Sequence, residues 1–121
     1  GYPRTYTPAK TENYENLIRL AFTNKYPFHV PIDAPIMLSV VAFFPIPQSY
    51  SKKKQEMARN GQLLMMRKPD ADNVLKAVLD GLNKVAWADD ARIWSIDMTK
   101  HYNDTPYLSV TISWEDGEKD E

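Results

Sequence analysis

The sequence contains no cysteine among its 121 residues, which excludes disulfide bonds and thiolate metal sites. Because proteins of the reducing cytoplasm rarely keep disulfides, this absence favours a cytoplasmic location. No apolar run approaches the roughly 18 residues that a membrane-spanning helix needs, and no signal peptide is visible. We therefore expect a cytoplasmic protein that has no membrane partner.

The chain also lacks a strong excess of either charge, since its formal net charge is −1. The charge is unevenly distributed: residues 115–121 read EDGEKDE, and removing their five acids and one lysine leaves 14 basic and 11 acidic residues, a net of +3. Divalent cations bound to clustered acids would make the electrostatic potential around the protein more positive. A slightly acidic composition is therefore compatible with a polyanionic partner.

The length fits a single domain with a modest core, and the sequence has no internal repeat. We expect the domain to span residues 1–114 and the acidic tail to span residues 115–121. Apolar spacing and capping signals predict three helices. They cover about residues 11–25 with Thr11 as N-cap, 51–59 with Gly61 as the C-terminal stop, and 70–87.

Three strands are predicted from β-rich or alternating segments. IMLSVVAFF, residues 36–44, is apolar throughout most of its length, which favours a central strand covered on both faces. Residues 93–102 and 107–114 alternate, and the NDTP turn between them predicts an antiparallel hairpin with one wetter face. The expected fold is α/β in the broad sense (α+β): a small mixed sheet with an antiparallel hairpin, packed against two or three helices in a single domain.

RKPDADNVLKAVLDGLNKVAWADD, residues 67–90, places carboxylates at both ends of the third predicted helix. Asp70 and Asp72 precede it, and Asp89 and Asp90 follow it. Each acid has an ordinary interpretation as a helix cap or a turn residue, and Lys76 could pair with an aspartate four residues away. Like charges this close repel unless a cation, a proton or solvent separates them. The ordinary interpretations together explain less well why the acids bracket one helix.

Two other chemistries fit the acids less well. An EF-hand calcium loop fails because Val74 takes the third ligand position, Leu75 stands where the glycine belongs, and no glutamate closes the loop. A glycosidase with two carboxylates is conceivable from the acids alone. The chain is small for a sugar cleft, and nothing else in the sequence supports that reaction.

Hard-metal chemistry on phosphate fits better. Mg²⁺ prefers oxygen ligands and keeps several waters, so two or three aspartates make a sufficient protein shell. A metal-activated water can attack a phosphodiester while a lysine stabilises the transition state. Between residues 51 and 69 there are six basic residues and one acid, Glu56. A solvated helix face is the ordinary interpretation of such a run, but here it leads into the acids, so we expect it to bind the phosphates of a substrate. Its members are Lys52, Lys53, Lys54, Arg59, Arg67 and Lys68.

KPDADNVLKAVLDGLNKVAWADDARI, residues 68–93, resembles the signature of the RusA family of Holliday-junction resolvases. The pattern consists of Pro-Asp-x-Asp-Asn, then a lysine, then Leu-Asp-x-Leu-Asn, and then a short hydrophobic segment followed by Asp-Asp. The N-terminal PR…YTPAKTENYE is similar to the family's Pro-Arg segment and the start of its first helix. The resemblance implies a homodimeric, magnesium-dependent endonuclease, bacterial or phage-encoded, that nicks four-way DNA junctions symmetrically. We expect Mn²⁺ to substitute for Mg²⁺.

Carried onto this chain, the resemblance makes Asp70, Asp72 and Asp90 the metal-binding catalytic acids and places Lys76 at the scissile phosphate. Asp89 is a further candidate ligand, although successive residues of an extended chain point opposite ways. Asn73 and Asp80 match the motif and are expected to be structural, with Asp80 holding Lys76. Arg4 joins the predicted DNA-binding set.

Three expectations complete the prediction. Related sequences begin with a strand before the Pro-Arg segment and have a longer loop after it, so we expect residues to be missing at the N-terminus and between Arg4 and Thr5. A non-catalytic protein that grips branched DNA is the alternative function, because the same basic tract could bind without cleavage. The candidate dimer-interface residues, if exposed, are Phe43, Phe44, Ile46, Trp87 and Met98.

Overall fold

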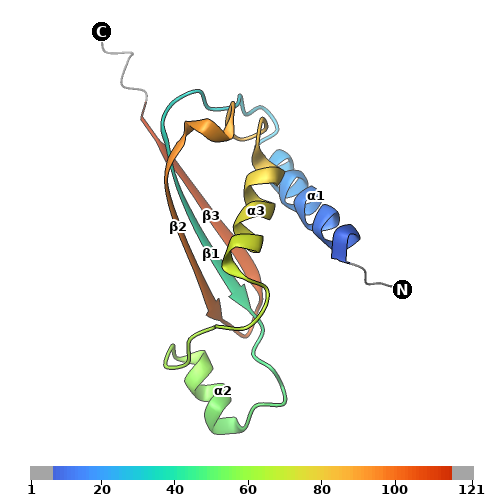
Figure 1. Ribbon diagram of the computed structural model, residues 1–121, viewed down its shortest axis with the longest axis vertical. Helices are drawn as coiled ribbons and strands as arrows, with labels where there is room; N and C mark the ends of the chain where they lie inside the picture. Colours follow the sequence, from blue (N-terminus) through green and yellow to red (C-terminus); the bar gives the residue numbers. More distant parts are fainter. Residues whose placement is uncertain (1–6, 116–121) are drawn as a thin grey trace.

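The computed structural model describes the backbone of residues 7–115 and the side chains of residues 14–115. Three helices and a three-stranded mixed sheet form one domain (Figure 1), which confirms the predicted α+β class. Arg4, its junction with Thr5, and the tail from residue 116 lie outside these ranges. The elements in chain order are α1 (Thr7–Lys25), β1 (Ile36–Phe44), α2 (Lys52–Arg59), α3 (Ala71–Leu82), the 3₁₀ turn η1 (Asp90–Arg92), β2 (Ile93–Tyr102) and β3 (Tyr107–Trp114).

The strand order is β2-β1-β3, with β1 parallel to β2 and antiparallel to β3. The central position predicted for β1 is confirmed, but the predicted hairpin pairing is wrong. β2 and β3 do run in opposite directions, yet β1 lies between them and pairs with both. The turn that joins them passes the end of β1, where the Asn103 amide donates to the Phe44 carbonyl at 2.9 Å. The most apolar strand takes the centre because both of its edges are then hydrogen-bonded and covered.

One face of the sheet is buried much more deeply than the other. Ile36, Leu38 and Val40 of β1 are at most 2% exposed and belong to the core beneath α3, whereas Met37 on the opposite face is 47% exposed. The expectation that both faces of β1 are covered is therefore wrong. The strand is apolar on both faces, but the helices of the described chain bury only one.

α3 is shorter than predicted and ends at Leu82 rather than near residue 87. Asn83 turns to an extended conformation and Lys84 has a positive φ of 69°, which stops the helical hydrogen bonding. Ala86 and Trp87 are fully buried all the same, because the chain folds back and Trp87 forms bridges with Ile32 and Asn83. The sequence pattern of apolar residues is consistent with the burial of this segment, but the prediction that the segment is helical is wrong.

The other two helices match the sequence prediction in type. α1 begins at Thr7 rather than at the predicted Thr11. α2 begins after Ser51, whose hydroxyl accepts from the Lys54 amide at 3.1 Å, and ends before Gly61, whose φ of 87° favours glycine. None of the helices in the described ranges is long and apolar enough to cross a membrane.

α1 crosses α3 at close range near the end of α3. A Cβ atom at Gly81 would lie 2.9 Å from the Glu15 carbonyl oxygen, closer than real Cβ atoms come. Arg19 donates to the carbonyls of Asp80 and Gly81 at 3.0 Å each. These carbonyls lie in the last turn of α3, where a cation is favourable. The crossing fixes α3, and with it the acidic segment, against the rest of the domain.

α2 lies beyond the end of the sheet, at the bottom of the view in Figure 1. It is held there by a second, smaller core in which Ala58 of α2 and Met65 contact Tyr102 of β2. The Arg59 guanidinium also binds the Asp104 carboxylate, with distances of 3.0–3.2 Å. The basic helix is therefore attached to the domain through its C-terminal half.

Candidate metal and DNA-binding site

Asp70 occupies the N-cap position of α3, but its side chain caps nothing. Its Oδ1 atom instead accepts a hydrogen bond from Lys68 Nζ at 2.9 Å, and half of the side chain is exposed. Asp72 follows in the first turn of the helix, where a carboxylate is favourable, and is exposed. The ordinary cap interpretation therefore fails for the Asp70 carboxylate, which is free of the backbone.

The electrostatics keep this carboxylate ionised. The hydrogen bond from Lys68, and then the charge of the same ammonium, hold the pKa of Asp70 below its usual value. Asp70 and, less strongly, Asp72 in turn raise the pKa of Lys68. Both acids therefore lie close to one ammonium group, and Asp70 is available in the deprotonated form that a metal ion requires.

Asp89 and Asp90 have protein partners of different kinds. The Oδ2 atom of Asp89 accepts from the Ala91 amide at 3.0 Å, and Lys84 Nζ lies 3.4 Å from Oδ1. The first contact and then the second lower the pKa of Asp89. The turn interpretation thus holds for Asp89. Asp90 accepts a 2.8 Å hydrogen bond from the indole N–H of Trp87.

Trp87 is a site residue that sequence reasoning missed. It was a candidate for the dimer interface, but its side chain is fully buried within the chain and unavailable to a partner. A buried indole N–H usually finds an acceptor, and an acid three residues later is a near candidate. That spacing is the signal that could have suggested the Trp87–Asp90 contact.

The two pairs of acids lie at opposite ends of α3. The helix has 12 residues, which at 1.5 Å per residue is about 18 Å. In Figure 1 the start of α3 lies beside the lower half of the sheet, and the η1 turn that begins with Asp90 lies at the top. Among residues 14–115, no three acidic or histidine side chains gather closely enough to hold an ion. The expectation that acids from both ends share one ion within a single chain is therefore wrong.

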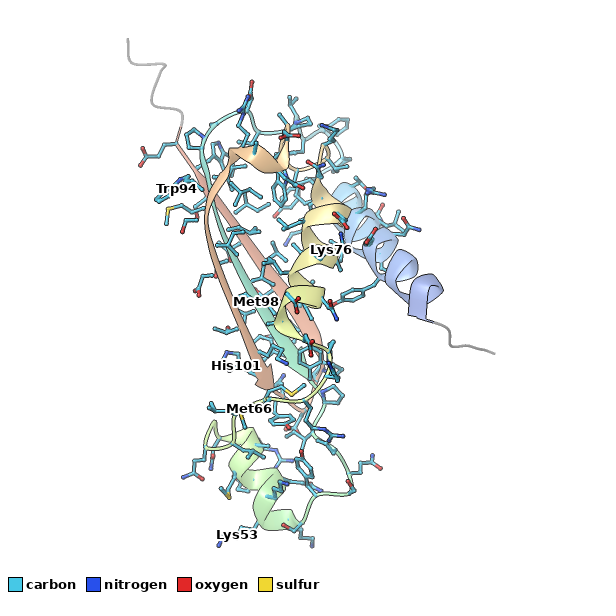
Figure 2. The ribbon with its side chains drawn as sticks, viewed as in Figure 1. Lys53, Met66, Lys76, Trp94, Met98 and His101 are labelled. Atoms are coloured by element: carbon cyan, nitrogen blue, oxygen red, sulfur yellow. The ribbon has the colours of Figure 1, made fainter. Side chains whose placement is uncertain are left out.

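Lys76 lies between the two acidic pairs, on the middle of α3 (Figure 2). Its Nζ atom is 3.2 Å from Asp80 Oδ2, so the predicted pairing over four residues is confirmed. Its side chain is 73% exposed. The pair leaves the lysine accessible to a ligand that approaches the outer surface of the helix.

The predicted DNA-binding residues divide into free and engaged side chains. Lys52 and Lys53 are exposed at the start of α2, and Figure 2 shows Lys53 at the end of the helix farthest from the sheet. Lys54 Nζ lies 4.1 Å from the centre of the Tyr50 ring, a cation–π contact. Arg59 binds Asp104 and Glu56, so its guanidinium holds α2 in place. Arg67 is exposed, with NH1 3.5 Å from the Tyr50 hydroxyl.

The donor set at the start of α3 fits a hard divalent cation. Asp70 and Asp72 offer exposed carboxylate oxygens, and neither side chain caps the helix. Mg²⁺ is commonly bound through one or two carboxylates together with waters and substrate phosphates. A cation would have to displace Lys68 from Asp70.

The fold and the site define a small α+β domain with carboxylates at both ends of one helix and a basic helix alongside. Comparison with known sequences identifies its class: residues 1–113 match the family described as endodeoxyribonuclease RusA. The chain belongs to this family, and membership implies the nuclease activity of a Holliday-junction resolvase. It is also similar to the uncharacterized protein YqaN of Bacillus subtilis (strain 168), with 34% identity over 107 residues that cover 87% of this chain and 75% of YqaN.

Proposed function

We propose that the protein is a magnesium-dependent endonuclease that resolves Holliday junctions by symmetric phosphodiester nicking in DNA recombination and repair. Mn²⁺ would substitute for Mg²⁺. The observation that carries the proposal is that the Asp70 carboxylate makes no cap hydrogen bond to α3. It lies beside Asp72 at the start of the helix, and exposed basic residues precede it in the sequence.

The residues have distinct roles in this proposal. Asp70 and Asp72 would hold the cation, which when bound would supply an activated water and neutralise charge on the phosphate. Lys68 leaves Asp70 when the cation binds and, with Arg67, becomes available to the DNA backbone. Lys76, positioned by Asp80, contacts the scissile phosphate. Lys52, Lys53 and Lys54 bind phosphates farther along the same DNA arm.

The position of Asp90 leads us to propose a homodimer with shared sites. Within one chain Asp90 is a helix length away from Asp70. A twofold dimer in which the two α3 helices run antiparallel would bring the start of each helix to the partner's Asp90. Each active site would then take Asp70 and Asp72 from one protomer and the other acid from its partner. A four-way junction has paired strands to nick, and a twofold dimer supplies two sites.

The test of the proposal is the Asp70→Asn variant on a synthetic four-way junction. We expect nicking with Mg²⁺ to fall by at least about a hundredfold, since a metal ligand that acts in the chemical step is lost. Binding measured without metal should become tighter, because a carboxylate that repels phosphate is gone. The matched control is Asp97→Asn, which removes one charge from an exposed residue of β2. Undiminished nicking by Asp70→Asn would refute the proposal.

Binding of branched DNA without cleavage is the second candidate function. It is favoured by the observation that Asp70, Asp89 and Asp90 each have a hydrogen-bond partner within the protein. A protein of this kind would bind the junction with strong salt dependence, leave it intact with Mg²⁺ or Mn²⁺, and respond to Asp70→Asn and Asp97→Asn in the same way.

A further inference from the structure

The segment from Leu64 to Pro69 joins α2 to α3 and determines where Asp70 lies. None of its residues makes a backbone-to-backbone hydrogen bond with another residue of the described chain. The Met65 side chain is buried in the small core, while Leu64 and Met66 on either side of it are 69% and 80% exposed. Something other than secondary structure must therefore fix the last part of this segment, between Met65 and α3.

Lys100 of β2 makes that connection. Its Nζ atom donates to the carbonyl oxygens of Arg67 and Pro69, at 2.8 Å each. These two carbonyls lie on either side of Lys68, and the carbonyl of Pro69 directly precedes Asp70. Hydrogen bonds from an ammonium group are stronger than those between neutral groups. One side chain thus ties the entry to α3 to a strand of the sheet.

The base of Lys100 is itself well fixed. Lys100 pairs in register with Ala42 of the central strand, which is 2% exposed. β2 therefore provides a rigid support, and the partly buried lysine stem spans from it to the segment. The ammonium also lies near enough to Asp70 to contribute to its lowered pKa, after Lys68. Lys68 binds the carboxylate, whereas Lys100 binds the backbone that carries it.

We propose that Lys100 is a positioning residue for the metal-binding carboxylates, holding Asp70 where it can share a cation with Asp72. The inference rests on the proposed function, because it assumes that these acids bind a divalent cation. It adds a residue that lies outside the acidic motif, 30 positions after Asp70 in the sequence.

The direction of the effect on metal affinity distinguishes positioning from simple electrostatics. Lys100 and Lys68 are both cations close to Asp70. By charge alone, removing either one should tighten the binding of a divalent cation. If Lys100 positions the acid, its removal should weaken binding, while removal of Lys68 should still tighten it. Lys68→Met is therefore the matched control for Lys100→Met.

The experiment measures Mn²⁺ binding to the full chain without DNA, by calorimetry and by the electron paramagnetic resonance of free Mn²⁺. We expect Lys100→Met to weaken binding on the order of tenfold, as is typical when support for a metal ligand is lost. Lys68→Met should bind as tightly as the parent or more tightly. Lys100→Arg, which can still donate to both carbonyls, should regain most of the affinity. Asp70→Asn should abolish binding at the site.

The outcomes separate the two proposals. If Asp70→Asn abolishes binding but Lys100→Met binds as tightly as the parent, the role of Lys100 is refuted and the metal site stands. If Asp70→Asn leaves binding unchanged, both proposals fail. Hydrogen exchange checks the structure of Lys100→Met: faster exchange should be confined to residues 64–73. If that variant unfolds, Lys100→Gln, which keeps one donor group, replaces it and should show an intermediate loss of affinity.

Discussion

Asp70 and Asp89 show how the same residue type serves different purposes at the two ends of one helix. Both occupy an N-cap position, Asp70 for α3 and Asp89 for η1. The Asp89 carboxylate accepts a hydrogen bond from a backbone amide, as cap residues do, whereas the Asp70 carboxylate binds a lysine and makes no cap hydrogen bond. A carboxylate that makes no hydrogen bond to the backbone can bind a metal ion without disrupting a turn or a helix end. By this criterion Asp70 is the better ligand and Asp89 the structural acid.

The Trp87→Phe substitution tests whether Trp87 positions Asp90. Phenylalanine keeps most of the buried ring but removes the N–H that binds Asp90 Oδ1 at 2.8 Å. We expect junction cleavage to fall on the order of tenfold, as when a supporting hydrogen bond to a metal ligand is lost. The free energy of unfolding should fall by about 1–3 kcal/mol, because a fully buried side chain becomes smaller. Cleavage is measured at saturating junction, and stability by urea unfolding.

The control for this substitution is Trp94→Phe. Trp94 is 67% exposed and points away from α3 (Figure 2), so both cleavage and stability should stay near those of the parent. Junction binding without metal should be unaffected by either change. Full cleavage by Trp87→Phe would show that Asp90 does not depend on the indole.

The sequence predicts which acids are candidate ligands, but it does not predict the residues that form hydrogen bonds with them. The acids follow a motif with fixed local spacing. Trp87 and Lys100 act through hydrogen bonds. The partner of Trp87 depends on how the chain folds back after α3, and the partners of Lys100 depend on how β2 lies beside the segment that precedes α3. Lys100 and Pro69 are 31 residues apart, and no periodicity in the sequence relates them. Arg59 was likewise assigned to DNA by its charge, although its guanidinium binds Asp104.

At the scale of elements, local signals predicted the strands well and their pairing poorly. The bounds of all three strands match the predicted segments, because alternation and β-rich composition act within a few residues. The order β2-β1-β3 depends on which strand is most apolar and therefore becomes central. A four-residue turn suggests a hairpin, but β1 pairs with both strands and lies between them.

The contact between α1 and α3 gives a prediction for Gly81→Ala. In an isolated helix this change is stabilising by about 1 kcal/mol. Here the new Cβ atom would meet the Glu15 carbonyl oxygen at 2.9 Å and Ile18 Cβ at 3.3 Å. Since the first obstacle is backbone, the helices must separate, and we expect a net loss of about 1–3 kcal/mol in the free energy of unfolding. Urea unfolding followed by circular dichroism measures it.

Asn73→Ala is the matched control on the same helix. Asn73 is exposed on α3, so replacing it with alanine should raise stability by a few tenths of a kcal/mol through helix propensity alone. The two alanine substitutions should therefore change stability in opposite directions. If Gly81→Ala is as stable as the parent, α1 and α3 do not approach each other this closely.

For the whole molecule, the central fact is that the two acidic pairs of one chain lie at opposite ends of a 12-residue helix. The length of the helix keeps the two pairs apart within one chain. Either a second copy of the chain brings Asp90 to the start of α3, or Asp90 does not act together with Asp70. The basic residues of α2 lie beyond the end of the sheet near the Asp70 end. In a twofold dimer they would extend outward from each of the two composite sites, along separate arms of a junction.

Mixing two inactive variants decides between shared and separate sites. If each site takes Asp70 from one protomer and Asp90 from its partner, a heterodimer of Asp70→Asn with Asp90→Asn contains one site with both acids and one with neither. Exchange of subunits should then restore nicking to about a quarter of the parent's rate: random exchange makes half of the dimers mixed, each with one of two sites intact. The restored product should carry single nicks, because the second site of each mixed dimer lacks both Asp70 and Asp90. Sites contained within one chain would each carry one substitution, and the mixture would stay as inactive as its components.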